Sequence, residues 1–154
     1  MSFFKKIWKG IKSLFTKKKI AEAVHTGIDV VERLKEALDS PLTPLFTSLI
    51  PGNVDDAVCA QLKYWLPQIL VELRLGDELL RSRGADALVQ YAVQHLRMLS
   101  KELRDKKFLE IAAMISRALT AGSDGGNAIT YEEFKAIVKA VYNAEYKTQH
   151  QQND

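Results

Sequence analysis

The chain has 154 residues, of which 47% are hydrophobic and 27% charged, a balance that excludes a wholly disordered protein. Its single cysteine excludes an intramolecular disulfide, and its apolar runs are too short to span a bilayer. The net charge of +3 is unevenly distributed: residues 1–19 carry seven lysines and no acid, so residues 20–154 hold 15 basic and 19 acidic residues, a net charge of −4.

Residues 1–19 form the first predicted element, a basic amphipathic helix. Its apolar residues recur every three or four positions and therefore form one stripe on a helix. The stripe consists of Phe3, Phe4, Ile7, Trp8, Ile11, Leu14 and Phe15, and the lysines of the segment are Lys5, Lys6, Lys9, Lys12, Lys17, Lys18 and Lys19. We interpret these residues as a binding surface, in which the aromatic rings enter the headgroup region of a membrane and the lysines meet anionic lipid.

The same pattern also permits docking on the rest of the chain, on a second copy of it or on another protein. Lysine interrupts the apolar residues every few positions, so the segment lacks the continuous apolar region of a signal peptide, and we expect cytoplasmic synthesis. The segment resembles the small cationic openings of some internal virion proteins of tailed phages. That resemblance covers about the first 19 residues and implies an assembly component whose N-terminal helix inserts into a neighbouring subunit.

Residues 20–146 are predicted to form one helical domain, because no segment combines two-residue alternation with β-branched residues. A first helix spans Ile20 to Asp39, with Gly27 weakening its middle. A proline-bounded connector over residues 40–53 contains a short helical turn from Pro44 to Leu49.

Asn53 is predicted to cap the next helix, which Pro67 kinks and which breaks at Gly76 and between Arg81 and Gly84. From Ala85 we predict a long helix. Its apolar side consists of Leu88, Tyr91, Ala92, His95 or Leu96, Leu99 and Leu103. A further apolar set follows at Phe108, Ile111, Ala112, Ile115 and Leu119.

A glycine-rich turn over residues 122–128 precedes the last predicted helix, from Tyr131 to Tyr146, and residues 147–154 form a polar tail. The predicted fold class is therefore all-α: a compact multi-helix bundle preceded by the basic amphipathic helix.

The glycine-rich turn and its flanking helices, residues 108–142, resemble an EF-hand. Asp124 matches the third loop position, Ile129 the hydrophobic eighth, and Glu133 the closing glutamate, so the resemblance implies Asp124 and Glu133 as calcium ligands. The first and fifth ligand positions are glycines, Gly122 and Gly126, and the motif is degenerate. Thr130 and Glu133 also fit a capping box at the start of a helix, which we prefer as the explanation of the same residues.

Residues that carry catalysis elsewhere are scattered here. Cys59 is interpreted as a small core residue, and His25, His95 and His150 have no metal-binding spacing. The acidic pairs Asp55–Asp56 and Asp77–Glu78 stand at predicted helix starts, where carboxylates favour the helix dipole. We expect no enzyme activity, no metal and no cofactor.

Three hypotheses follow. The first is a non-enzymatic protein that docks peripherally on an anionic membrane through residues 1–19. The second is a structural assembly component, such as a phage virion protein, and the third is a calcium-responsive adaptor. Exposed stripes on two copies would also permit a homo-oligomer, whereas the acidic balance of residues 20–154 argues against nucleic acid as a partner.

Overall fold

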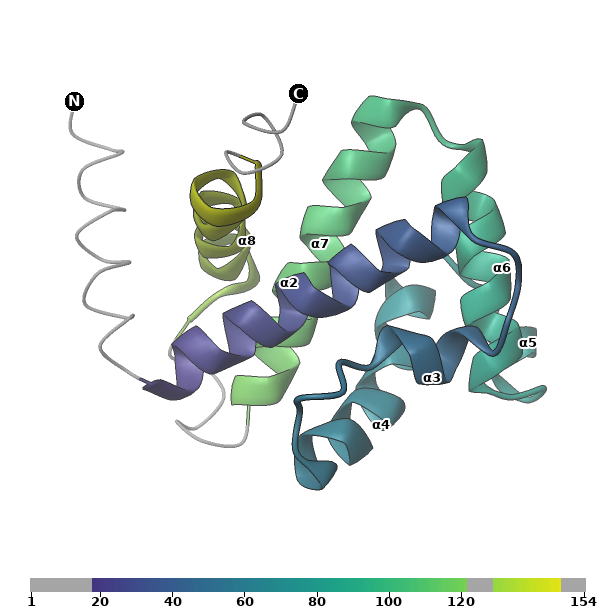
Figure 1. The fold of residues 1–154 in the computed structure, drawn as a ribbon, viewed down its shortest axis with the longest axis horizontal. Coiled ribbons are helices and arrows are strands. Elements are labelled where there is room, and N and C mark those ends of the chain that lie inside the picture. The colour runs from purple at the N-terminus through teal and green to yellow at the C-terminus, as the bar shows by residue number, and fades with distance from the viewer. Residues whose placement is uncertain (1–17, 122–128, 148–154) are drawn as a thin grey trace.

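The computed structural model describes residues 18–121 and 129–147, and within these ranges every regular element is a helix (Figure 1). The elements are α2 (Lys18–Asp39), α3 (Leu45–Leu49), α4 (Asp56–Glu72), α5 (Glu78–Arg81), α6 (Ala85–Met98), α7 (Lys101–Thr120), α8 (Tyr131–Val141) and the π-helix η1 (Tyr142–Lys147). The predicted all-α bundle is confirmed.

The centre of the bundle is the crossing of α2 with α7, the most extensive helix pair. Small residues allow the two backbones to approach closely. A Cβ atom added to Gly27 would lie 2.5 Å from the carbonyl oxygen of Ala112 and 2.6 Å from Oγ of Ser116. Ser116 is fully buried, and its hydroxyl hydrogen-bonds the carbonyl oxygens of Ala23, across the crossing, and of Ala112. Gly27, expected only to weaken its helix, is the residue that permits this crossing.

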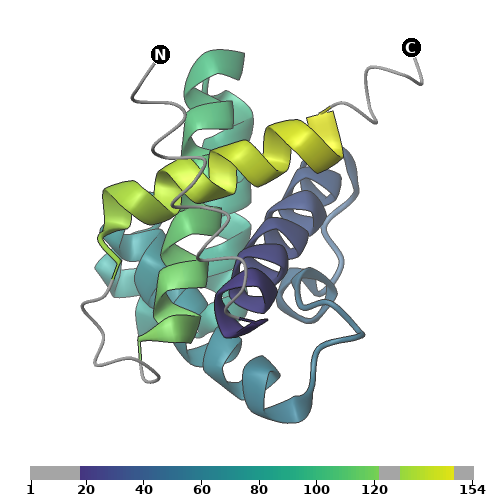
Figure 2. The ribbon, with the colours of Figure 1, turned by 90° about the vertical axis from the view of Figure 1, so that its left-hand side faces the viewer.

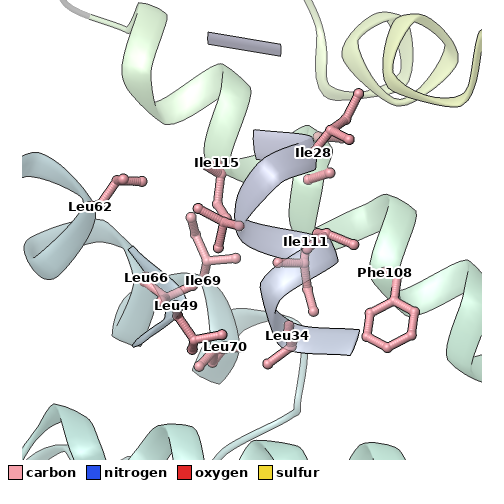
Figure 3. Packing of buried hydrophobic residues seen from close by; sticks show 14 of the residues in the cluster. Ile28, Leu34, Leu49, Leu62, Leu66, Ile69, Leu70, Phe108, Ile111 and Ile115 are labelled. Atoms are coloured by element: carbon pink, nitrogen blue, oxygen red, sulfur yellow. The ribbon is translucent and has the colours of Figure 1, made fainter. Parts of the chain in front are cut away.

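The remaining helices pack around this pair. In Figures 1 and 2, α7 lies between α8 and α4, and α8 crosses α7. Helices α2, α3, α4, α6, α7 and α8 contribute to one continuous cluster of buried apolar side chains, part of which is shown in Figure 3, and Leu80 of α5 and Tyr142 of η1 pack against it. Residues from α2, α4 and α7 converge there, among them Ile28, Leu66 and Ile111. One core therefore joins α2 to α8.

The structure confirms the first two helices and corrects the start of the third. α2 contains the whole predicted span from Ile20 to Asp39, and α3 ends at Leu49, as expected. The N-cap of α4 is Asp55, whose carboxylate accepts a hydrogen bond from the backbone N–H of Val58 at 2.8 Å. The prediction of Asn53 as this cap is wrong, because Asn53 lies in a turn closed by the Val54 N–H and the Pro51 carbonyl.

The end of α4 is a Schellman motif with an arginine in the left-handed position. α4 runs through Pro67 without a break and ends at Glu72. The N–H of Leu75 donates to the carbonyl of Leu70 and that of Arg74 to the carbonyl of Val71, the bond pair of this motif. Arg74 has φ of 61°, a conformation that glycine adopts without strain. α4 thus ends before Gly76, the position at which the sequence predicted the break.

The predicted long helix from Ala85 is interrupted. α6 ends at Met98, and Ser100 caps α7 by accepting a hydrogen bond from the N–H of Leu103. Leu103 therefore belongs to the first turn of α7 and is exposed, as is Tyr91 of α6, so neither lines the core as predicted. The buried face of α6 consists instead of Leu88, Val89, Ala92, Val93 and Leu96.

Two arginines donate hydrogen bonds to the C-terminal ends of α2 and α6. The guanidinium of Arg97 donates to the carbonyls of Ala37 at 3.0 Å and Ser40 at 2.9 Å, where α2 ends. That of Arg104 donates to the carbonyls of Leu96 and Leu99, where α6 ends. Unpaired carbonyls at helix C-termini are thereby satisfied by side chains. Arg97 of α6 therefore links that helix to the end of α2.

Candidate functional site

The predicted binding surface lies almost wholly outside the described residues. Residues 1–17 precede the first described position. They include these members of the predicted surface: Phe3, Phe4, Lys5, Lys6, Ile7, Trp8, Lys9, Ile11, Lys12, Leu14, Phe15 and Lys17. Lys18 and Lys19 form the first turn of α2. The last two residues of the basic segment therefore belong to the central helix of the bundle, so the boundary between segment and bundle lies inside the helix.

The outer side of α2 carries acidic groups. Asp29, Glu32 and Glu36 line an open groove of about 500 Å³ with the turn at residues 51–53. Arg33, in the same groove, donates to the carbonyl of Ser48 at 3.1 Å and ties α2 to the end of α3. The three carboxylates outnumber the one guanidinium, so this groove is acidic.

A second cavity, of about 230 Å³, lies between α2, α7 and the junction of α8 with η1. Its apolar lining includes Ile28 of α2, Phe108 of α7 and Val138 of α8. Lys35 enters this apolar surrounding: its Nζ lies 5.3 Å from the centroid of the Phe108 ring and 4.1 Å from that of Tyr142. This arrangement suits a cation, because the faces of aromatic rings are electronegative.

Lys35 is also held by polar partners. Its ammonium group hydrogen-bonds the hydroxyl of Tyr142, 107 residues away in the chain, and lies 3.5 Å from Oε1 of Glu32. The side chain retains 26% exposure. This role of Lys35 was not predicted from the sequence. The signal was present in the spacing, since Ile28, Val31 and Lys35 are three and four residues apart and share a face.

The thiol of Cys59 and the imidazole of His25 are engaged in local structure. Cys59 is half-buried, and its thiol contacts the carbonyl of Val54 at 3.6 Å. Nδ1 of His25 lies 3.6 Å from a carboxylate oxygen of Glu145, a pair that joins α2 to η1 on the surface. His95 is half-buried on α6. Asp55 and Asp77, the first members of the two acidic pairs, stand at helix starts as predicted, and they serve there as the N-caps of α4 and α5.

The loop of the EF-hand resemblance falls in residues 122–128, so Asp124 lies outside the described residues. The described part of the motif is used for capping. The hydroxyl of Thr130 accepts from the N–H of Glu133 and contacts its carboxylate at 3.2 Å, while Ile129 is buried in the core. Across residues 18–121 and 129–147, no group of three or more His, Cys, Asp or Glu side chains is placed to hold a metal ion.

Tyr131 is a second residue that sequence reasoning did not single out. Its hydroxyl oxygen is buried without a hydrogen-bond partner within the described chain. Burial, reinforced by the carboxylates of Glu110, Glu132 and Glu72, holds the pKa of this hydroxyl well above its usual value. Glu110 lies 3.3 Å from Nζ of Lys107, which donates to the Leu73 carbonyl. The cluster joins the end of α4 to α7 and α8.

Comparison of the chain with protein-family models, with characterised proteins and with solved structures found no match. Among the described helices, none combines the length and apolar character needed to cross a bilayer. The functional argument therefore depends on the residues themselves: the basic, aromatic segment at positions 1–19 and the bundle to which it is joined.

Proposed function

We propose that the protein is a non-enzymatic membrane-binding protein that docks on anionic lipid surfaces through residues 1–19. The observation that carries the proposal is the composition of that segment. Seven lysines, four aromatic residues and no acid occur in 19 positions, and the apolar residues recur at helical spacing. Rings at one side of a helix and lysines at the other match the headgroup region of an anionic bilayer, where apolar and cationic groups are both accommodated.

The bundle supports this role in two ways. Lys18 and Lys19, the last two residues of the segment, belong to α2, the helix at the centre of the core. The acidic groove formed by Asp29, Glu32 and Glu36 gives the bundle a side that anionic lipid repels. Docking through the segment would therefore orient the molecule, with the acidic groove directed away from the lipid.

The energetics favour reversible binding. Each lysine close to an anionic surface contributes about 1 kcal/mol, and the aromatic and aliphatic side chains add the burial of apolar surface. Neutralising three of the lysines is therefore expected to cost about 3 kcal/mol, or on the order of a hundredfold in partition coefficient. The effect should shrink as salt is added, because salt screens exposed charges.

The test is flotation of the full chain with vesicles of phosphatidylcholine that contain or lack phosphatidylserine. The triple variant Lys5→Gln, Lys6→Gln, Lys9→Gln should lose binding about a hundredfold. The matched control is Lys63→Gln, Lys101→Gln, Lys106→Gln, which removes the same charge from exposed positions of the bundle and should bind like the parent chain. Trp8→Ala should weaken binding without changing the charge.

Two outcomes would contradict the proposal. One is that the parent chain fails to float with phosphatidylserine vesicles at low salt, which would favour the assembly hypothesis, in which the segment inserts into a neighbouring subunit. The other is that both triple variants lose binding equally, which would assign the effect to net charge rather than to the segment. A calcium requirement for flotation would instead favour the adaptor hypothesis.

A further inference from the structure

We infer that the cavity between α2, α7 and the α8–η1 junction binds a small amphiphilic carboxylate, with its apolar body in the cavity and its carboxylate on Lys35. The residues that line this cavity all lie outside residues 1–19, and the inference does not depend on the proposed membrane docking. The inference combines three observations: apolar walls, a lysine fixed within them, and a volume suited to a small molecule. In Figure 3, Ile28 and Phe108 lie at the edge of the core cluster, and both line the cavity.

The walls of the cavity are apolar and come from three helices. Ile28 and Val31 extend from α2, Phe108 and Ala112 from α7, and Val138 from α8. All five are buried, and their helices pack against one another around the core. Walls already packed in place favour a ligand because less conformational entropy is lost when it binds.

Lys35 gives the cavity its charge preference. An ammonium group has three donor hydrogens, and within the described chain the carboxylate of Glu32 and the hydroxyl of Tyr142 account for two of them. The third can donate to a ligand oxygen. Lys139 and Asp105 also line the cavity, and Glu32 lies 3.5 Å from Lys35, so these four charged side chains sum to zero. The carboxylate of the ligand is therefore matched by the ammonium group of Lys35 that it meets, and not by the net charge of the cavity.

The volume limits the size of the ligand. About 230 Å³ exceeds the roughly 150 Å³ of an engineered cavity that admits benzene and is smaller than the roughly 300–1,000 Å³ of pockets for drug-sized molecules. A molecule of on the order of ten non-hydrogen atoms fits between these limits. Octanoate, with an eight-carbon chain ending in a carboxylate, is a probe of this size and charge.

The lysines of the cavity also distinguish this ligand from the chain's own N-terminal segment. Phe4 or Trp8 could supply an apolar side chain of suitable size, but each is flanked by lysines in sequence. Bringing these lysines to Lys35 and Lys139 would place like charges together. We therefore assign the cavity to an anionic ligand and treat occupation by the segment as the competing outcome.

The experiment is isothermal titration calorimetry of the full chain with octanoate, below its micelle-forming concentration and without vesicles. Octylammonium, with the same chain and the opposite charge, should not bind measurably. Lys35→Met should weaken octanoate binding at least tenfold, whereas Lys63→Met, at an exposed position of α4, should leave it within twofold.

A second variant separates loss of binding from loss of fold. Leu109 is half-buried on the lining, so Leu109→Trp should fill the cavity and weaken octanoate binding while Lys35 and its partners remain. Thermal unfolding of each variant checks that it is folded. The inference is overturned if octanoate fails to bind at millimolar concentration, if octylammonium binds as well, or if neither Lys35→Met nor Leu109→Trp weakens binding. It is also overturned if Trp8→Gln raises octanoate affinity tenfold, because the segment would then be the occupant.

Discussion

At the scale of single residues, backbone contacts explain positions that side-chain patterns misjudge. Gly27 sits in the middle of α2, where helix propensity alone disfavours it by about 1 kcal/mol relative to alanine. The structure places its Cα against the backbone of Ala112 and the hydroxyl of Ser116, at distances that leave no room for a methyl group. Glycine is therefore required by the α2–α7 contact, and its unfavourable propensity is offset by that packing.

Replacing Gly27 by alanine should destabilise the protein although alanine is the better helix former. Overpacking against backbone atoms that cannot rotate away is expected to produce a net loss of about 1–3 kcal/mol in the free energy of unfolding. Urea denaturation measures this loss. Gly52→Ala is the control, because a Cβ at Gly52 meets nothing within 4 Å. Equal stability of the two variants would refute the close-packing explanation.

Replacing Arg74 by glycine should stabilise the protein. Arg74 is exposed and has φ of 61°, which costs a residue with a side chain on the order of 1 kcal/mol. Glycine removes most of that cost. We therefore expect the free energy of unfolding to rise by about 0.5–1 kcal/mol and the Tm measured by calorimetry to rise by about 2–3 °C. Arg74→Ala retains the backbone strain and should not be more stable than the parent chain. If both variants are stabilised, the arginine side chain itself, and not its backbone conformation, is the source of the cost.

At the scale of elements, helix boundaries follow capping chemistry more closely than hydrophobic periodicity. The sequence predicted one apolar side from Leu88 to Leu103, but Ser100 caps a new helix and Leu103 is exposed at its first turn. A serine before a charged first turn was a readable signal. The position of Arg97, by contrast, depends on which helix end lies nearby in space, and residues 57 to 60 positions apart cannot be paired from one sequence.

Replacing Arg97 by methionine should loosen the end of α2. The variant keeps the apolar part of the side chain and removes two hydrogen bonds to carbonyls, which we expect to cost about 1 kcal/mol given their partial exposure. Amide hydrogen exchange should rise in the last turn of α2 first. Arg83→Met, also exposed, should change stability by less than about 0.5 kcal/mol. Unchanged exchange near Ala37 would contradict the role assigned to Arg97.

At the scale of the whole molecule, the fold class and most helices were predictable because amphipathic periodicity survives in a single sequence. Ile20 to Asp39 and the short helix ending at Leu49 were predicted in place. The cavity was not, since it depends on Lys35 meeting Tyr142 across most of the chain. The segment at residues 1–19 remains a prediction from sequence. Patterns within one helix were thus readable, whereas contacts between helices required the structure.

The stability of the whole molecule should fall at alkaline pH through Tyr131. The folded pKa of its hydroxyl lies above the usual value near 10, so the unfolded chain loses this proton first. The stabilising contribution is complete below pH 10 and declines as pH rises above it, by at most about 1.4 kcal/mol per pH unit for one proton. Tyr131→Phe should flatten that decline in urea titrations between pH 9 and 11. If the free energy of unfolding declines equally in Tyr131→Phe and in the parent chain, Tyr131 is not the source of the alkaline loss of stability.

The position of Lys18 and Lys19 in the first turn of α2 has a mechanical consequence. If residues 1–19 bind a membrane as proposed, a force on them would act on the central helix of the bundle and not on a peripheral loop. Traction along α2 would have to slide it lengthwise past α7, and the Ser116 hydroxyl bound to the Ala23 carbonyl opposes such sliding. Sliding α2 along α7 would break many contacts between the two helices at once, whereas a peripheral segment can be pulled off by breaking its contacts one after another. A membrane-bound molecule pulled through α2 would therefore stay folded under forces that would detach a peripheral segment.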